Sequence, residues 1–478
     1  MLRFILLTLA TLPLTLGTTF AQDTIWVRQY DLGSDEQLIG VASRGDKIIG
    51  VGNYTDPSNY DAEGLAVVFN QSGDTLQTGT IDFEGDEVLM DAFIDQDMNY
   101  YVAGNGRIGE KTSLRPLDFI KDFKPQEINY SIIMKADSSG ILKWGIIDTP
   151  YAAIGVVVDS SGNCYATGYR GSFSTGTDLA IVKINPDGDT AWVRRFDTNF
   201  LESFYRCAID HLGNIVSSGW ALDFLTFTFK GILAKVKPDG ETLWLKTFSL
   251  DSFTALVGVD VDKDGNVITT GFCGTSKNID FLVLKTDSMG ETLWTRRFDY
   301  TEDDEGLGVV CDSEGYIFAT GYFADGDCRL LKISPDGELI WSYRYDHGGY
   351  EHFQDITIDE SGYPICVGFT DFSQTPYDLL IAKFSPITGI AERQKTVFGH
   401  RSSVILLPGE LVFDVPVAGR YRIDIFDLLG KRVSGKIEHK LNPGRNYIPL
   451  NPLASGIYII RTTGPGQKTE TYKAIMAK

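Results

Sequence analysis

The segments VVVDSSGNCYATGY (Val156–Tyr169) and DLAIVKINPDGDTAWVRRF (Asp178–Phe196) decide the fold, because the chain repeats them. A second clear copy reads VDVDKDGNVITTGF from Val259 and DFLVLKTDSMGETLWTRRF up to Phe298. One glycine marks every copy, at Gly52, Gly104, Gly168, Gly219, Gly271, Gly321 and Gly368. Self-similarity at a period near fifty residues indicates a repeat architecture and takes precedence over any local motif.

Each copy predicts four short strands separated by turns. In the quoted copy these are Ile154–Val158, Cys164–Gly168, Leu179–Ile184 and Ala191–Phe196, with a Pro-Asp-Gly hairpin signal between the last two. Four strands in a repeat of this length are typical of a propeller blade. The seven marked copies therefore predict an all-β protein whose residues 22–388 form a seven-bladed β-propeller.

The two ends of the repeat region predict how the ring closes. Thr24–Tyr30 has the pattern of a fourth strand, although no copy precedes it, and Leu379–Phe384 is a third strand with no fourth strand after it. We expect these two segments to pair, because pairing removes the exposed edges that an open array would leave.

The repeat pattern resembles a known family. D-x-x-G-N-x-Y-x-x-G, followed by a hydrophobic residue and K-x-x-x-D-G-x-x-x-W, recurs over residues 24–384 and is similar to the bacterial β-propeller repeat family called SBBP. The resemblance implies a propeller in an exported protein and implies little about activity.

Composition and the N-terminus predict export. The net charge of −21 argues against nucleic acid and anionic membranes as partners. Arg3, the apolar run Phe4–Gly17 and the segment Thr19–Ala21 are typical of a signal peptide over residues 1–21. No later segment reaches the ~18 apolar residues of a transmembrane span. The six cysteines include no C-x-x-C pair, and we expect mostly buried, free thiols.

Two sets of repeated side chains indicate structural roles. Tryptophans follow the Pro-Asp-Gly-type turns, among them Trp26, Trp192, Trp244, Trp294 and Trp341. An Asp ends the first strand and a Lys lies on the third strand in six copies, as in Asp159 with Lys183 and Asp262 with Lys285. One hypothesis is a repeated Asp–Lys contact; the alternative is separate use of Asp in turns and of Lys at strand edges.

Acidic residues eight positions before the repeated Asp form the candidate ligand-binding site. They are Asp35, Glu87, Glu202, Asp304 and Glu351. We expect them on the face formed by the loops between second and third strands and by the loops between blades. There they would line one funnel and attract a cation or a polyhydroxylated ligand. The alternative is a solvated acidic surface. Loops of this face vary in length, as binding loops do, and the longest is Asn105–Asn129.

The sequence identifies no cofactor outright; calcium is the cation that such acids favour. Asp262–Asn266, preceded by Asp260, resembles the start of a calcium loop, with a hairpin turn as the alternative. His347 and His352 are weak candidates for a metal site. No catalytic residue is predicted, and an enzymatic role is left open with a preference against it.

After Phe384 the repeat stops, and we predict a linker over residues 389–400 and a small immunoglobulin-like β-sandwich over residues 401–478. GRYRIDIFDLLGKRV (Gly419–Val433), LASGIYIIR (Leu453–Arg461) and YKAI (Tyr472–Ile475) resemble the type A C-terminal sorting domain of the type IX secretion system. The usual Pro-Asn-Pro-Phe opening is replaced by Leu-Pro-Gly at residues 407–409. The resemblance implies that this machinery is a partner and that the protein ends secreted or on the outer cell surface. A plain accessory domain is the alternative.

The sequence thus predicts an exported propeller scaffold that binds an extracellular glycan or protein and is delivered by its C-terminal domain. Two alternatives stay open. One is a secreted polysaccharide-active enzyme that uses the acids of the funnel, and the other is a structural component of a surface layer.

Overall fold

The computed structural model describes residues 24–386 and 403–476 with gaps. The gaps in the first range are 56–61, 84, 109–127, 149–150, 173–175, 198–200, 224–225, 276, 301–302, 325, 346–349 and 372–376. Those in the second are 408–409, 416–417, 428–430, 435–436, 443, 451–455 and 465–468. The predicted signal peptide, most of the loop Asn105–Asn129 and His347 lie outside the described residues. The chain divides into two compact units, residues 1–392 and 393–478.

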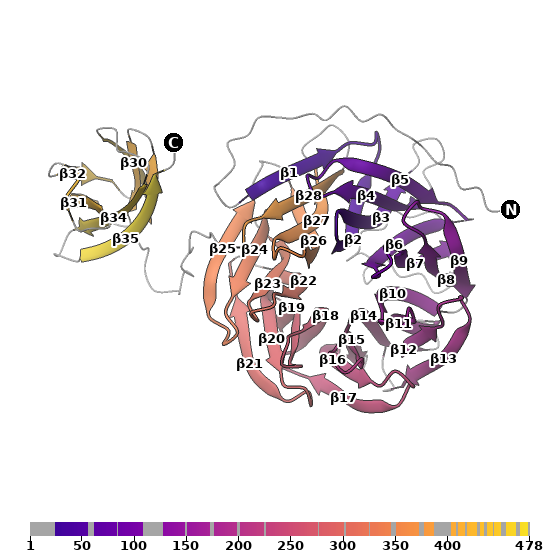
Figure 1. Ribbon diagram of the computed structural model, residues 1–478. Coiled ribbons are helices and arrows are strands. Elements are labelled where there is room, and N and C mark those ends of the chain that lie inside the picture. The colour runs from indigo at the N-terminus through magenta and orange to yellow at the C-terminus, as the bar shows by residue number, and fades with distance from the viewer. Residues whose placement is uncertain are drawn as a thin grey trace. The chain divides into compact units, whose positions relative to one another are not determined.

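The first unit is a β-propeller whose described strands pair in groups of four (Figure 1). Blades 1 to 3 consist of β2 (Glu36–Arg44), β3 (Lys47–Thr55), β4 (Ala62–Asn70), β5 (Thr75–Ile81); β6 (Asp86–Ile94), β7 (Tyr100–Ile108), β8 (Ile128–Ala136), β9 (Leu142–Asp148); and β10 (Tyr151–Val158), β11 (Cys164–Ser172), β12 (Gly176–Ile184), β13 (Thr190–Phe196). Blades 4 and 5 consist of β14 (Leu201–Ile209), β15 (Ile215–Asp223), β16 (Thr228–Val236), β17 (Thr242–Phe248); and β18 (Phe253–Val261), β19 (Val267–Thr275), β20 (Asn278–Thr286), β21 (Thr292–Phe298).

The last two blades show how the ring closes. Blade 6 consists of β22 (Asp304–Cys311), β23 (Ile317–Phe323), β24 (Cys328–Ile333) and β25 (Leu339–Tyr345), and blade 7 of β26 (Glu351–Ile358), β27 (Pro364–Thr370), β28 (Asp378–Phe384) and β1 (Thr24–Tyr30). β1 pairs antiparallel with β28, from Tyr30 opposite Leu379 to Thr24 opposite Phe384. The predicted closure is therefore confirmed.

The strands of a blade differ in their position and burial. In Figure 1 the first strand of every blade faces the centre of the ring and the fourth strand lies outermost. β27 and β28 are buried throughout, whereas most residues of the outer strand β13 are exposed or partly exposed. Apolar clusters join neighbouring blades, as Trp26 and Ile365 of blade 7 and Leu38 and Leu65 of blade 1 do.

The repeated glycine has a packing reason. A Cβ added to Gly368 would lie 1.8 Å from the His352 carbonyl oxygen, and one added to Gly168 would lie 1.9 Å from the Ala152 oxygen. The same close approach to the first strand occurs at the other five marked glycines. Only glycine allows this approach, which lies beside a β-bulge of the first strand.

The second unit is a small two-sheet β domain. One sheet has the order β29-β30-β33 and the other β32-β31-β34-β35. The strands are β29 (Ser403–Leu407), β30 (Glu410–Val415), β31 (Gly419–Asp427), β32 (Ile437–Leu441), β33 (Gly444–Pro449), β34 (Gly456–Thr463) and β35 (Thr469–Met476). Leu411 and Ile448 of the first sheet pack with Ile423 and Ile460 of the second, which gives the domain its own core.

Two further observations concern the whole chain. None of the described residues lies in a helix that is long and apolar enough to span a bilayer. All six cysteines are free thiols, five of them buried and Cys311 partly exposed. Burial raises the pKa of the Cys164 and Cys207 thiols above the usual range, which keeps them protonated and unreactive.

Candidate functional site

The acids that the repeat predicted as ligands occupy the start of the first strands. Glu87, Glu202, Asp304 and Glu351 hold equivalent places in β6, β14, β22 and β26. In the first blade the equivalent residue is Glu36, opposite Tyr54, and not the predicted Asp35. The prediction was one residue early because the hairpin between β2 and β3 turns tightly between Arg44 and Lys47, whereas the other first hairpins are longer.

These carboxylates do not line an open funnel. Glu36, Glu87, Glu202, Asp304 and Glu351 are all 0% exposed. Each lies where the first strand of one blade meets the third strand of the blade before it. At two of these junctions the backbone N–H of Glu36 donates to the Tyr377 carbonyl (3.0 Å), and that of Glu351 to the Gly326 carbonyl (2.8 Å). A polysaccharide cannot reach groups that are fully buried in this position.

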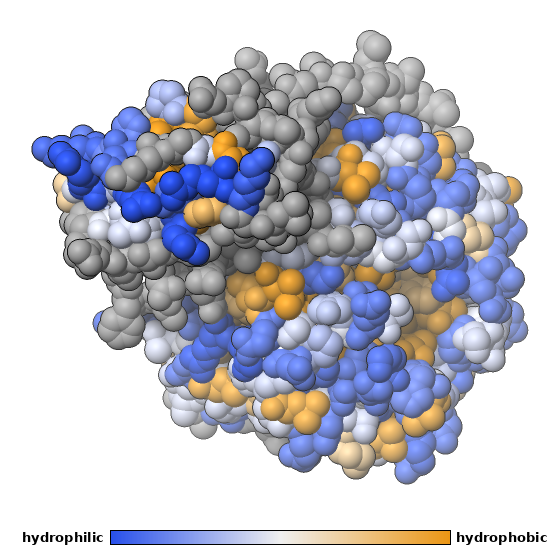
Figure 2. All heavy atoms as spheres, turned by 60° about the vertical axis from the view of Figure 1, so that its left-hand side comes forward, coloured by the Kyte–Doolittle hydropathy of each residue, from blue (hydrophilic) through white to orange (hydrophobic). Residues whose placement is uncertain are grey.

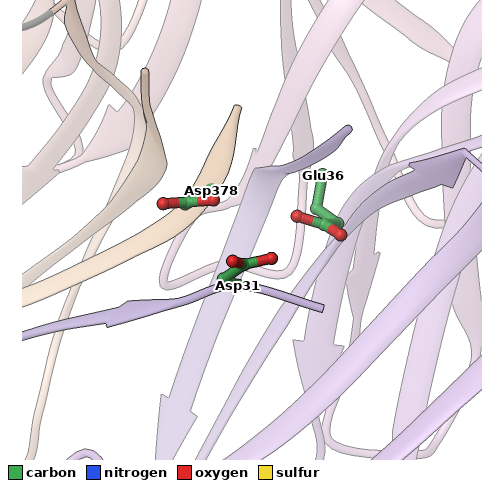
Figure 3. A group of neighbouring side chains, drawn as sticks. All are labelled: Asp31, Glu36 and Asp378. Carbon is green, nitrogen blue, oxygen red and sulfur yellow. The ribbon is translucent and has the colours of Figure 1, made fainter. Parts of the chain in front are cut away.

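The closing junction, between blades 7 and 1, carries the candidate metal centre. Asp31 follows β1, Asp378 begins β28 and Glu36 begins β2. One carboxylate oxygen of each residue lies within 4.8 Å of the others, and Figure 3 shows the three carboxylates gathered around one space. Glu36 and Asp378 are buried and Asp31 is exposed, so the group opens to solvent on one side. We call these residues the closing triad.

The electrostatics of the closing triad favour a positive charge. Burial raises the pKa of Glu36 to about 8, helped by the negative charges of Asp31 and Asp378 and opposed by the Ser34 N–H, which donates to Oε1 at 2.7 Å. Oε2 of Glu36 is buried and has no hydrogen-bond partner among the described residues. An arrangement of oxygens alone, with excess negative charge, suits a hard divalent cation.

The next junction, between blades 1 and 2, shows a related arrangement. Burial raises the pKa of Glu87 to about 7, against the effect of the Tyr130 hydroxyl, which donates to it. Asp82 and Asp86 raise it further. Here the tyrosine satisfies one carboxylate oxygen.

The repeated Asp and Lys meet in three of the six predicted pairs. Lys235 lies 2.8 Å from Asp210, Lys285 lies 2.9 Å from Asp262, and Lys383 lies 2.6 Å from Asp359. In each of the six repeats that have it, the Asp also accepts backbone N–H groups of its turn, as Asp262 does from Asp264 and Asn266. Asp262–Asn266 is therefore a hairpin turn, with its carboxylate shared between the turn and a lysine.

An aromatic residue on the second strand accounts for the other pairs. Tyr101 and Tyr165 donate their hydroxyls to Asp95 and Asp159, while Lys135 and Lys183 lie over the two rings at 5.0 and 5.4 Å. Lys332 likewise lies 5.1 Å from the centre of the Phe318 ring. The three ion-paired repeats have Val216, Ile268 and Ile365 at this position. The lysine reaches the acid only where this second-strand position is aliphatic, and Lys383 does so with the Tyr363 ring 5.4 Å away.

The repeated tryptophans join one blade to the next. Indole N–H groups donate to carbonyls in the hairpin of the following blade at 3.0–3.1 Å, as Trp26 does to Gln71, Trp192 to Pro238 and Trp244 to Ser288. Trp294 donates in the same way to Pro335, and Trp341 is buried at the equivalent position of blade 6. These side chains explain the tryptophan in the repeat through packing and a hydrogen bond between blades.

A buried arginine crosses the centre of the ring. Arg206 of blade 4 donates to the carbonyls of Ile39 in blade 1 and Met90 in blade 2. Its guanidinium lies 3.7 Å from Asp91 and 3.5 Å from Asp355. Burial raises the pKa of both carboxyls, and the guanidinium opposes that rise. The sequence analysis missed this group, because the repeat holds no second arginine in an equivalent contact to draw attention to it.

Aromatic side chains gather at the loop ends of blades 6 and 7. The His352 ring stacks between Tyr322 (4.4 Å between centroids) and Phe369 (4.6 Å), and Phe369 contacts Tyr377. The Tyr350 hydroxyl donates to Tyr322 at 2.9 Å. We call these five residues the aromatic stack. His352 and Phe369 are buried, whereas the three tyrosines are partly exposed. The stack accounts for His352, one of the two predicted metal candidates, as a packed ring.

Comparison with protein families identifies the C-terminal unit. Residues 408–477 match the secretion system C-terminal sorting domain. This confirms the resemblance drawn from the sequence. The tail directs the protein through the type IX secretion system to the cell surface or the medium.

Comparison with solved structures returns propellers and enzymes that contain them. A polysaccharide lyase of family PL25, an ulvan lyase, is 14% identical and aligns over 74% of this chain and 95% of its own with a TM-score of 0.47. The Dos1 propeller is 8% identical over 76% and 95% of the two chains, with a TM-score of 0.44. The propeller domain of the Trilobed protease from Pyrococcus furiosus is 10% identical over 76% and 99%, with a TM-score of 0.41. No curated protein matches the chain.

Proposed function

We propose that this exported propeller binds an uncharged extracellular glycan on the face that carries the aromatic stack. The observation that supports this proposal is the set of partly exposed tyrosines Tyr322, Tyr350 and Tyr377 at the loop ends of blades 6 and 7. A tyrosine offers an apolar ring and a polar hydroxyl, which match the C–H faces and hydroxyl groups of a sugar.

The surroundings of the aromatic stack suit the same kind of ligand. Glu305 lies opposite Tyr322 in the register of β22 and β23. A carboxylate accepts hydrogen bonds from sugar hydroxyls, and the net charge of −21 disfavours an anionic polysaccharide. Figure 2 shows that the visible surface is mostly hydrophilic, with apolar side chains in separate patches, as expected for an exported protein.

The enzymatic alternative loses its main support. It depended on the acids of the predicted funnel as catalysts, and those side chains are fully buried between blades. A general acid or nucleophile must reach the bond that it cleaves.

Calorimetric titration of the exported chain with a panel of uncharged oligosaccharides tests the proposal. We expect one class to bind, and Tyr322→Ala and Tyr350→Ala to weaken that binding at least tenfold, about 1.4 kcal/mol. Leu212→Ala is the matched control, because Leu212 is 71% exposed in a first-to-second-strand hairpin, at the other end of the blades. Equal binding by the tyrosine variants, or binding of protein ligands alone, would contradict the proposal.

A further inference from the structure

The closing triad is one copy of a pattern that the repeat carries. Three register positions are equivalent from one junction between blades to the next: the residue after a fourth strand, a residue near the start of the third strand, and a residue near the start of the next first strand. Strand register identifies them. Five junctions have an acid at all three: Asp31, Asp378 and Glu36; Asp82, Glu63 and Glu87; Asp197, Asp178 and Glu202; Asp299, Asp280 and Asp304; Asp346, Asp327 and Glu351. Asp346 lies outside the described residues.

The remaining two junctions have no acid at any of the three positions. They carry Thr149, Tyr130 and Tyr151 between blades 2 and 3, and Ser249, Lys230 and Thr254 between blades 4 and 5. Thr149 also lies outside the described residues. If the acids served only solubility, some junctions would have one or two acids at these positions. Each junction instead has three acids or none, which indicates that the three carboxylates act as a unit.

The triads differ in the positive charge that the chain supplies. Arg195, Arg297 and Arg344 occupy one register position on the fourth strand beside three of the triads. Arg297 lies 2.8 Å from Asp251 and 4.0 Å from Asp280, and Arg344 pairs with Asp327. At the closing junction the same position holds Gln29, and between blades 1 and 2 it holds Thr80. The closing triad thus lacks the arginine that three of its four counterparts have.

We propose that the closing triad binds a calcium ion. A calcium ion holds oxygens at about 2.3–2.6 Å, so oxygens on opposite sides of it are about 5 Å apart. One carboxylate oxygen from each residue of the triad lies within 4.8 Å of the other two, which fits that span. The buried Oε2 of Glu36, which has no hydrogen-bond partner among the described residues, is an unused ligand atom. Asp31, which is exposed, gives the ion an entry path and room for water ligands.

The ion would act on ring closure. Asp31 ends the strand that closes blade 7, Asp378 begins the strand to which it pairs, and Glu36 begins blade 1. Asp31 and Glu36 lie five residues apart, so one ion therefore joins this N-terminal segment to Asp378, which the chain connects to it only around the whole propeller. Closure becomes dependent on extracellular calcium, which the protein meets only after export.

Thermal unfolding and equilibrium dialysis of the exported chain test the proposal. After removal of metals with EDTA, addition of CaCl₂ at a hundredfold excess over the dissociation constant is expected to raise Tm by about 5 °C. MgCl₂ at the same concentration is expected to have a smaller effect, because Mg²⁺ requires a compact octahedral site.

The variants separate metal binding from a merely structural role. Glu36→Gln should bind one calcium ion fewer, be at least as stable as the wild type in EDTA, and be less stable in calcium, so that the order of stability reverses. Asp31→Asn, at an exposed position, should lose the same ion without harm to folding. Thr254→Val changes the equivalent position of an acid-free junction and should keep the wild-type calcium stoichiometry. Absence of calcium binding by the wild type, an equal response to magnesium, or unchanged stoichiometry in both triad variants would overturn the proposal.

Discussion

The closing junction and the junction between blades 5 and 6 have acids at the same three register positions, and they differ in the residue beside those acids. Between blades 5 and 6, burial raises the pKa of Asp280, Asp299 adds to that rise, and Arg297 opposes it. At the closing junction Gln29 occupies the position of Arg297, and no arginine is among the groups that influence the raised pKa of Glu36. The comparison teaches that the repeat specifies an acidic junction, while single positions decide whether the chain places an arginine beside it.

First-strand carboxylates at the same two junctions also differ in their compensation. At the closing junction Asp355 accepts the Val41 N–H at 3.0 Å and lies beside Arg206. In blade 5 the equivalent residue is Gly258, and the carboxylate that reaches blade 6 is that of Asp260, two residues on. Asp260 accepts the Cys311 N–H at 2.7 Å, and burial raises its pKa to about 6. No arginine is among the groups that influence this pKa.

Replacement of Arg206, which lies beside the buried carboxylates of Asp91 and Asp355, should have the largest effect on stability. Arg206→Gln leaves two buried carboxylates without their cation, and we expect a loss of about 3–5 kcal/mol in the free energy of unfolding, measured with urea. The double variant Arg206→Gln/Asp355→Asn should recover part of that loss, because one buried charge disappears with the arginine. A loss below 1 kcal/mol would show that the guanidinium is dispensable at the centre.

The tryptophans test whether closure is weaker than an internal junction. Trp26→Leu and Trp294→Leu remove the same indole contact and hydrogen bond, at a cost of ~3 kcal/mol each. Only at the closing junction can a terminal strand detach by itself. Hydrogen exchange should therefore accelerate in β1 of the Trp26 variant and remain slow in β21 of the Trp294 variant. Equal protection in both variants would contradict this difference.

The raised pKa of Asp260 predicts that the stability of the fold depends on pH. Its pKa in the folded state, about 6, exceeds the ~3.9 of an unfolded chain, so the folded state binds the proton more tightly. Stability therefore falls as the pH rises from about 4 to about 6, by ~2–3 kcal/mol, and stays lower above that range. Asp260→Asn should remove this slope, apart from a constant loss from its altered contact with Cys311. A difference between wild type and variant that does not change with pH would count against the assignment.

Much of this fold could be predicted from the sequence, because the same turn residues and the same strand pattern recur in each repeat. The pairing of Thr24–Tyr30 with Leu379–Phe384 followed from the incomplete ends. The register of the first blade could not be predicted in the same way. Its tight Arg44–Lys47 hairpin shifted the position that we counted along the sequence from Glu36 to Asp35.

Only part of the candidate site could be predicted from the sequence. The repeated acid of the first strand was found, but its burial and its partners were not, because Asp378 comes from the end of the propeller segment that is opposite to Asp31 and Glu36. The joint presence or absence of acids at three repeat positions is the signal that could have revealed them. The choice between an Asp–Lys ion pair and a cation–π contact depends on a third residue, such as Tyr165 or Ile268, on the strand between.

Exchange of the compensating residue tests the central claim most directly. Gln29→Arg places a guanidinium beside the closing triad, and Arg297→Gln removes one from the triad between blades 5 and 6. Tm is measured for both variants and the wild type in EDTA and in calcium. We expect Gln29→Arg to raise Tm in EDTA and to abolish the calcium response, and Arg297→Gln to lower Tm in EDTA and to enlarge that response. An unchanged calcium response in Gln29→Arg would contradict the claim that the closing triad takes its positive charge from solution.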